Sequence, residues 1–353
     1  MSAVVVVGAG IVGASVAYHL ARRGVPVTLI ERGPAPAADV TGDSFAWISG
    51  AGGDRPGGAR ELREYVLADH SRLEAELPDV TVRRTGSLTW DADDAVPGAA
   101  PRLAPGRFRV GRSDIAALEP HLQNPPEQAI HTPGDVGVDP TALTRALVTA
   151  AGAYGATVLH DTAVTALHLS GTRVRGVVSS AGHHTAATVV LAAGTDVPRL
   201  CAPVAPGLAV TSSPATLVRV GAPPGLVKSI VATPEFEVRE VRDGELWMPL
   251  AQGLGGGGTI GSESAARDAL HRLRTFFRGA EECRLLSCRT RGRPVPPHGP
   301  VIGHVTPDRS VYVAVMHSAV TLAPTVGRLV AEELVTGAPV RELRRCRPAV
   351  GDV

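Results

Sequence analysis

The chain has 353 residues, of which 44% are hydrophobic and 20% are charged, and its formal net charge is +1. This composition is typical of a globular protein with room for two domains, and it argues against surfaces for nucleic acid or anionic membranes, which need an excess of basic residues. No apolar run is long enough to cross a bilayer, and the four cysteines are too scattered for a disulfide framework or a zinc site, so we expect a cytoplasmic protein without a metal.

The N-terminal stretch predicts a strand, a tight turn and a helix. Four consecutive valines at 4–7 suit a parallel strand that is buried on both faces. They are followed by Gly8, Gly10 and Gly13, which would respectively permit a sharp turn, leave room for a pyrophosphate and let the helix lie close to the strand. The free N–H groups at the start of that helix would face the phosphates.

A second strand over 25–30 ends at Glu31, an acidic residue that would accept hydrogen bonds from a ribose and repel a 2′-phosphate. Strand, glycines, helix, second strand and acid occur in the order that a dinucleotide-binding site requires. The alternative is a glycine-rich turn in an unrelated α/β protein. A signal peptide is not expected, because a basic segment is missing and the glycines interrupt the apolar run.

The middle of the chain mixes loops, helices and strands. Residues 32–58 predict a partly ordered loop that folds against a ligand, and 59–77 predict a helix. A short helix over 113–118 would be capped by Ser113 or Asp114, and a longer one would begin with Asp139 as its N-cap and Pro140 in its first position. Strands are expected at 80–90, at 128–138 as a pair around a turn at 134–135, and at 157–159, 163–169, 174–179 and 188–191.

The second half continues with strands at 215–220, 229–233, 236–242 and 245–249 and a helix at 264–278. The glycine-rich run 253–261 lacks the Lys-Ser/Thr of a phosphate-binding P-loop and predicts a hairpin loop. A strand at 311–315 would feed a helix that starts at Pro324 and ends before Gly337.

Three segments make the chain resemble the D-amino-acid oxidase family of flavoproteins, which includes glycine oxidase and sarcosine oxidase. They are residues 4–31, residues 189–195 and the segment from Arg293 to Gly337. The resemblance implies an α/β fold with an FAD-binding Rossmann-like domain of the glutathione-reductase type and a second, α+β substrate domain built on an antiparallel sheet. The FAD-binding domain would be discontinuous, over 1–79, 139–205 and 289–353, with the substrate domain over 80–138 and 206–288.

The resemblance also implies FAD, which we expect to be held non-covalently because no cysteine matches a position of flavin attachment. The loop 42–47 would cover the flavin, and the start of the last helix would point its N–H groups at the pyrimidine ring. The expected cofactor contacts are Gly8, Gly10, Ile11, Val12, Gly13, Glu31, Arg32, Ser44, Phe45, Val164, Ala193, Gly194, Gly303, Ala319, Val320, Thr321 and Leu322.

The implied reaction is oxidation of a primary or secondary amine that carries a carboxylate, such as glycine, an N-substituted glycine or another amino acid. A hydride would pass from the α-carbon to the flavin, and O2 would reoxidise the flavin to give H2O2 and an imine or oxo acid. Arg293 matches the arginine that binds the substrate carboxylate in glycine-oxidase-like members, and its planar fork suits that task. A structural salt bridge at Arg293, or the use of Arg289 or Arg291 instead, is the alternative.

Five other residues are candidates for the site, and four of them have two interpretations each. His317 could assist the carboxylate or could be merely hydrogen-bonded, and His298 replaces the aspartate that the family usually has before a glycine. Trp47 and Trp247 are either pocket walls or core residues. Lys228 could promote oxygen reactivity or lie in solvent.

Two other functions compete with the oxidase. One is an FAD-dependent dehydrogenase of an amine or 2-hydroxy acid that passes electrons to a quinone or a carrier protein. The other is a non-catalytic flavin-binding protein that assembles with a partner. The sequence leaves the substrate, its chirality and the oligomeric state open.

Overall fold

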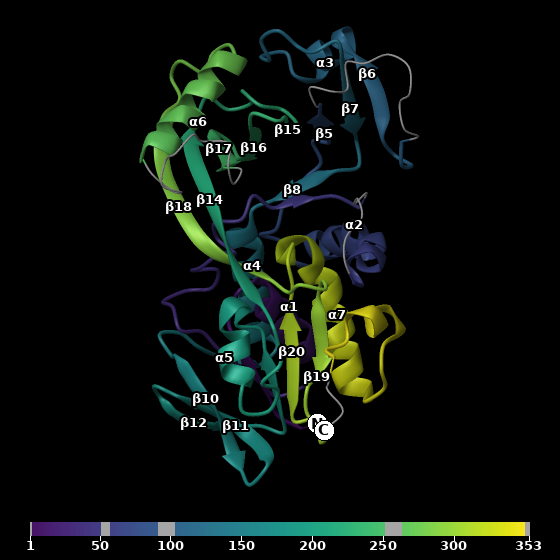
Figure 1. The fold of residues 1–353 in the computed structure, drawn as a ribbon, viewed down its shortest axis with the longest axis vertical. Coiled ribbons are helices and arrows are strands. Elements are labelled where there is room, and N and C mark those ends of the chain that lie inside the picture. The colour runs from purple at the N-terminus through teal and green to yellow at the C-terminus, as the bar shows by residue number, and fades with distance from the viewer. Residues whose placement is uncertain (1, 51–56, 91–102, 251–262, 350–353) are drawn as a thin grey trace.

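The structure is a computed structural model that describes residues 2–50, 57–90, 103–250 and 263–349. The glycine-rich run at 253–261, predicted as a hairpin loop, lies outside these residues. Two large sheets divide the molecule, one at the centre and one at the top of the view in Figure 1. None of the helices in the described ranges combines the length and apolarity that a membrane crossing requires.

The central sheet has six strands in the order β19-β20-β13-β1-β2-β9, all parallel except β19. Its strands are β1 (Val4–Val7), β2 (Val27–Ile30), β9 (Thr157–Leu159), β13 (Thr188–Leu191), β19 (Val301–His304) and β20 (Val311–Val315). Val4 and Val6 join the hydrophobic cluster on one face, and Val5 and Val7 join the cluster on the other. The prediction of a strand buried on both faces is therefore confirmed.

Helices cover one face of this sheet and a small sheet covers the other. The helices are α1 (Ile11–Ala21), α2 (Ala59–Glu76), α4 (Pro140–Ala153) and α7 (Ala319–Thr336), with η3 (Arg341–Cys346) beside them. The opposite cluster includes the three-stranded antiparallel sheet β10 (Val164–Ser170), β11 (Arg173–Ser179) and β12 (Gly182–Thr185), with η2 (Gly194–Asp196) and α5 (Val197–Cys201).

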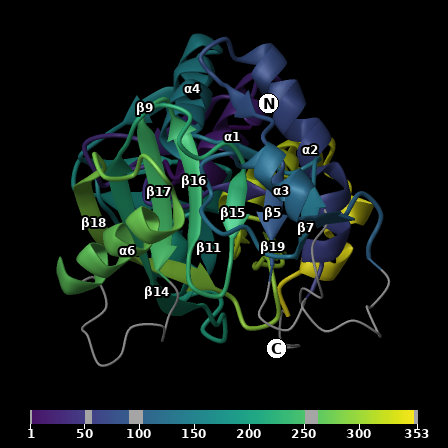
Figure 2. The same ribbon diagram turned by 90° about the horizontal axis from the view of Figure 1, so that it is seen from above.

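The second large sheet has eight strands in the order β18-β14-β17-β16-β15-β5-β7-β6 (Figures 1 and 2). They are β5 (Ser87–Thr89), β6 (Phe108–Gly111), β7 (Gln128–Thr132), β14 (Thr211–Gly221), β15 (Ile230–Ala232), β16 (Glu237–Arg242), β17 (Glu245–Leu250) and β18 (Arg284–Val295). Helices α3 (Arg112–Leu118) and α6 (Glu263–Phe276) pack against it. The sheet is antiparallel except for the parallel pair β15–β5.

The predicted strand pair at 128–138 is wrong in its pairing. Strand β7 joins the eight-stranded sheet, whereas β8 (Val136–Val138) pairs with β3 (Trp47–Ile48) and β4 (Val82–Arg83) in a third sheet. The turn between β7 and β8 therefore carries the chain from one sheet to another. Strand β18 also stays in the eight-stranded sheet past position 289, and the proposed domain boundaries stay a prediction.

Helix ends follow the sequence rules in one case and depart from them in two. Asp139 caps α4 by accepting hydrogen bonds from the N–H groups of Thr141 and Ala142, as predicted. Helix α3 begins earlier than predicted, with Gly111 as its N-cap and Asp114 accepting the N–H of Gly111. Helix α7 begins at Ala319, so Pro324 lies inside it instead of starting it.

A side chain of α2 lies beside the turn of α7 that precedes this proline. Pro324 has no N–H for the carbonyl of Val320, one turn earlier. The buried imidazole of His70, on α2, lies against the carbonyls of Val320 and Thr321, with its Nε2 3.3 Å from the Thr321 oxygen. The His70 imidazole thus bonds to the carbonyl next to the one that Pro324 leaves without a helical donor, so a side chain from another helix supports this turn.

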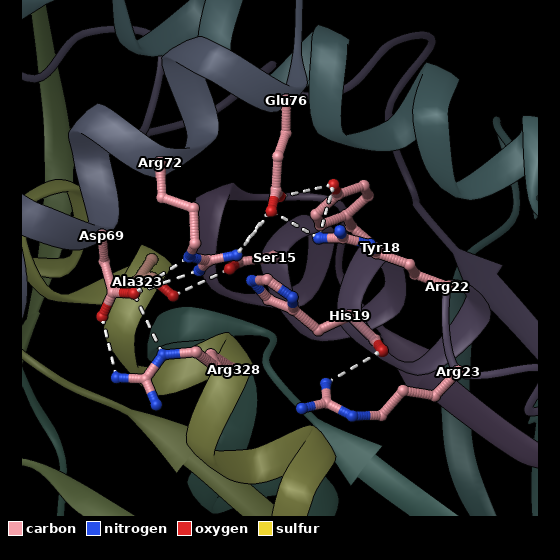
Figure 3. Close-up of polar contacts among 10 residues, drawn as sticks. All are labelled: Ser15, Tyr18, His19, Arg22, Arg23, Asp69, Arg72, Glu76, Ala323 and Arg328. Carbon is pink, nitrogen blue, oxygen red and sulfur yellow. Dashed lines mark hydrogen bonds and ion pairs between the residues drawn. The ribbon is translucent and has the colours of Figure 1, made fainter.

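An ionic network ties α1, α2 and α7 together (Figure 3). Asp69, on α2, accepts bidentate hydrogen bonds from Arg328 of α7 at 3.0 Å and 3.0 Å. Glu76, on α2, binds Arg22 and the Tyr18 hydroxyl. The hydroxyl of Ser15 donates to the Ala323 carbonyl at 2.8 Å, so α1 and α7 lie in direct contact. This network fixes the position of α7, whose first turn lines the candidate site.

Candidate functional site

A cavity of about 290 Å³ opens at the carboxyl ends of β1, β2 and β13, where ligands bind in open α/β sheets. We call it the strand-end cavity. Its lining includes seven predicted cofactor contacts, which are Gly8, Gly10, Glu31, Arg32, Val164, Ala193 and Gly194. The predicted contacts Ile11, Val12 and Gly13 do not line it and are buried.

The glycines of the first turn are required by close backbone approaches. Gly8 has φ +100°, and a Cβ on it would lie 2.8 Å from the Ala192 carbonyl oxygen. A Cβ on Gly13 would lie 1.9 Å from the Gly8 oxygen, so α1 rests directly on the turn. Gly10 instead borders the cavity, and a Cβ there would meet the Thr41 hydroxyl at 3.2 Å. These placements fit the roles that a pyrophosphate-binding turn assigns to the three glycines.

The carboxylate of Glu31 is held at the edge of this cavity. Its Oε2 accepts the N–H of Ala9 at 2.7 Å, and its Oε1 accepts the N–H of Gly33 at 2.8 Å. Arg32 points into ion pairs with Asp39 and Asp196 and does not neutralise Glu31 by a direct pair. An acid fixed in this place suits a ribose with free hydroxyls and disfavours a 2′-phosphate.

A second cavity, of about 380 Å³, shares Val40 and Thr41 with the first, so the two adjoin. We call it the intersheet cavity, because it is lined by residues of the eight-stranded sheet, by Trp47 of the third sheet and by the first turn of α7. Its lining includes the predicted residues Ser44, Phe45, Trp47, Arg293, His317, Ala319, Val320 and Thr321. Two adjoining cavities with these linings fit a dinucleotide cofactor that extends from the strand ends toward α7.

The first turn of α7 presents backbone N–H groups to the intersheet cavity. Ala319, Val320 and Thr321 line it, whereas Leu322 is fully buried and its N–H bonds to the Ser318 carbonyl at 3.1 Å. No side chain caps this helix, and its first turn holds no acidic residue. Ser318, the N-cap, has φ +56°, a costly conformation for a residue with a side chain. The positive end of the helix dipole therefore faces the cavity.

Arg293 reaches the intersheet cavity from β18, and the two alternative arginines do not line it. Its Nε is buried without a hydrogen-bond partner among the described residues. The Nε of Arg291 binds Asp43 at 2.9 Å, and Arg289 is exposed. Of the three arginines that the sequence left open, Arg293 is thus the one available to a ligand in the cavity.

Two arginines of the eight-stranded sheet hold the loop 42–47 in place. Arg219 donates to the Gly42 carbonyl and to the Asp43 carboxylate, at 2.6 Å and 2.9 Å. Arg239 donates to the carbonyls of Phe45 and Val138, both at 2.6 Å. Burial lowers the pKa of Arg239 to about 9. The loop predicted to cover the flavin is therefore held by hydrogen bonds from the eight-stranded sheet.

The remaining predicted residues are placed as follows. His317 lines the intersheet cavity with its Nδ1 2.9 Å from the Ser318 hydroxyl. Trp247 is fully buried, stacks under the Arg219 guanidinium and packs with Phe45, so it takes the core role that the sequence left open. His298 and Lys228 are exposed, and neither they nor Gly303 line the two cavities. The four cysteines also lie outside both linings, and the non-covalent binding of FAD stays a prediction.

Sequence reasoning missed two acidic residues that line the intersheet cavity, Asp43 and Asp135. Asp135 is 2% exposed, and its Oδ2 accepts hydrogen bonds from the Trp47 indole at 2.8 Å and the Ser87 hydroxyl at 2.7 Å. The sequence indicates only a turn at this position, after Gly134. Within the described ranges, no three His, Cys, Asp or Glu side chains form a group that could hold a metal ion.

A family model described as DAO, FAD dependent oxidoreductase, matches residues 3–333. Among curated proteins, the chain is 31% identical over 211 residues to the uncharacterized oxidoreductase YurR of Bacillus subtilis, covering 55% of each chain. It is 27% identical over 197 residues to a glycine oxidase of Bacillus licheniformis, covering 54% of this chain and 53% of that one. The chain thus spans about half the length of the curated relatives that it matches.

Solved structures share the fold over almost the whole chain. The glycine oxidase of Bacillus cereus superposes with a TM-score of 0.81 at 20% identity, covering 97% of each chain. The iminodiacetate oxidase of Chelativorans sp. BNC1 gives 0.80 at 23% identity, covering 98% of each chain. An L-amino acid deaminase of Proteus vulgaris gives 0.84 at 18% identity, covering 99% of this chain and 94% of that one.

Proposed function

Because the chain belongs to the DAO family of FAD-dependent oxidoreductases, we propose that it oxidises a primary or secondary amine that carries a carboxylate, with O2 as the electron acceptor. The observation that carries this proposal is Arg293, whose guanidinium lines the intersheet cavity with a buried, unpartnered Nε within the described structure. A guanidinium in such a place binds a carboxylate bidentately and fixes the orientation of the carbon next to it.

The other lining residues have complementary tasks in this proposal. Phe45 and Trp47 form apolar walls that exclude water from the reacting carbon. The N–H groups at the start of α7 stabilise negative charge that develops beside them. FAD, when bound, supplies the hydride acceptor, and the protein supplies orientation and field. The glycine and iminodiacetate oxidases among the structural relatives support this substrate class.

We also propose that the protein functions in the cytoplasm, since all four cysteines are free thiols.

Anaerobic titration of the purified holoenzyme tests the proposal. The flavin absorbance should bleach with one or more members of a panel of glycine, N-methylglycine, other N-alkylglycines, and D- and L-amino acids. Arg293→Met should raise the concentration for half-reduction by roughly 100-fold or more, because charged hydrogen bonds are lost from a partly buried carboxylate. The matched control Arg289→Met, on the same strand but exposed, should leave it unchanged.

Two results would count against the assignment. A flavin that stays oxidised with the whole panel would exclude this substrate class, and equal effects of the two arginine variants would exclude the carboxylate role of Arg293. Mixing the reduced enzyme with air then tests the acceptor. Rapid formation of H2O2 is expected, whereas slow reoxidation in air with fast reduction of a quinone dye would favour the dehydrogenase.

A further inference from the structure

Asp135 brings a negative charge to the wall of the intersheet cavity. It lies in the turn between β7 and β8, where the chain passes from the eight-stranded sheet to the third sheet. Its side chain is almost fully buried, and two donors, Trp47 and Ser87, both bind Oδ2. Its Oδ1 is buried without a hydrogen-bond partner in the described part of the chain. One oxygen of this carboxylate is thus doubly satisfied and the other has no donor.

The charges around the cavity show that Asp135 differs from the other acid there. Asp43 is neutralised by ion pairs with Arg219 and Arg291. Asp135 forms no ion pair with any described residue, although three arginines line the same cavity, at 63, 107 and 293. The nearby His131 does not compensate for it, because burial lowers the pKa of that imidazole and favours its neutral form.

A buried carboxylate without a cation is costly, and a ligand that brings a cation would remove that cost. We propose that Asp135 binds a positively charged nitrogen of the substrate while Arg293 binds the substrate carboxylate. This inference rests on the proposed function and extends it, since it requires a dipolar substrate. The charged nitrogen is either the α-ammonium group or the terminal cation of a basic side chain.

A purely structural role would instead make Asp135 the acceptor that orients the Trp47 indole. Asp135→Asn separates the two roles, because the amide retains a carbonyl oxygen that can accept from Trp47 and Ser87 but removes the charge. Asp135→Ala removes the acceptor and the charge together. A loss seen with alanine alone therefore reports the orientation of Trp47, and a loss seen with asparagine reports the charge.

Two pairs of isosteric ligands provide the test. 2-Aminoisobutyrate has an α-ammonium group and no α-hydrogen, so it cannot lose a hydride, and 2,2-dimethylpropanoate carries a methyl group in place of the ammonium. 5-Aminopentanoate and hexanoate form the corresponding pair for a distal cation. Dissociation constants would be measured on the oxidised holoenzyme by flavin absorbance changes and by calorimetry, for the wild-type protein and for Asp135→Asn, Asp135→Ala and Arg293→Met.

Asp135→Asn should weaken at least one amino ligand roughly 10- to 100-fold while its methyl counterpart stays within about twofold. If only 2-aminoisobutyrate loses affinity, Asp135 binds the α-ammonium group of the substrate. If only 5-aminopentanoate loses affinity, Asp135 binds the cation of a basic side chain. If both lose affinity, Asp135 can bind a charged nitrogen at either position. The inference is overturned if asparagine leaves both amino ligands unchanged, weakens each pair equally, or if neither amino ligand binds the wild-type protein. Arg293→Met should weaken all four ligands, and its failure to do so would refute the carboxylate role separately.

Discussion

Replacing Asp69 by asparagine should release helix α7 from helix α2. The Asp69 side chain is 7% exposed and binds Arg328 at 3.0 Å and Arg72 at 3.1 Å, with both arginines less than one-third exposed. The variant keeps the shape of the side chain but leaves two guanidinium groups facing an uncharged amide (Figure 3). Breaking a largely buried ion pair by removing one partner costs about 3 kcal/mol, so the free energy of unfolding should fall by that amount.

A matched control separates this effect from the loss of a surface charge. Glu263 and Arg267 form an ion pair along α6 in which the side chains are 76% and 66% exposed, so Glu263→Gln should change stability by less than about 0.5 kcal/mol. Urea unfolding of the two variants and the wild-type holoenzyme, with m-values compared, gives both numbers. Equal stability losses in Asp69→Asn and Glu263→Gln would refute the argument that burial makes the Asp69 network strong.

The same variant makes a prediction about pH. Burial alone would raise the pKa of Asp69, but hydrogen bonds from Arg328 and Arg72 outweigh it and lower the pKa. The charge therefore contributes stability that is fully present above the ordinary carboxyl pKa and is lost as pH falls through the lowered value. The stability gap between the wild-type protein and Asp69→Asn should close in acid, and a gap of constant size from pH 7 to pH 3 would contradict this.

Gly13→Ala would place a Cβ 1.9 Å from the Gly8 oxygen, so the purified variant should carry little FAD, as measured by its visible absorbance. The control Gly152→Ala, whose added Cβ would have no atom within 4 Å, should stay yellow. Full FAD content in Gly13→Ala would contradict the role of the glycine turn. Burial lowers the pKa of His70 to about 4, so its imidazole stays neutral in the fold and stability should decrease by about 3 kcal/mol as pH falls from 6.5 toward 4. In urea unfolding across that range, His70→Gln should show a flatter pH dependence, and an unchanged slope would refute the assignment to His70.

The local parts of the fold could be predicted because their causes are local. The approach of Gly13 to the Gly8 oxygen and the cap at Asp139 each join residues within a few positions of one another, and both agree with the structure. The start of α7 could not be predicted this way, because the imidazole that hydrogen-bonds to the Thr321 carbonyl belongs to His70, which lies 251 positions away. The split of β7 and β8 between two sheets likewise depends on partners that are distant in sequence.

The site shows the same division at the level of charge. Residues 289, 291 and 293 alternate along β18, so periodicity alone places all three arginines on one face. What distinguishes Arg293 is that Asp43, which lies 248 positions from Arg291, already pairs with that neighbour. Asp135 is recognised in the same way, by discounting the groups that already have partners. Its two donors both bind one oxygen, and no described cation pairs with it. The charges left after internal pairing are therefore the ones that report on the ligand, and they can be identified only after the pairs are known.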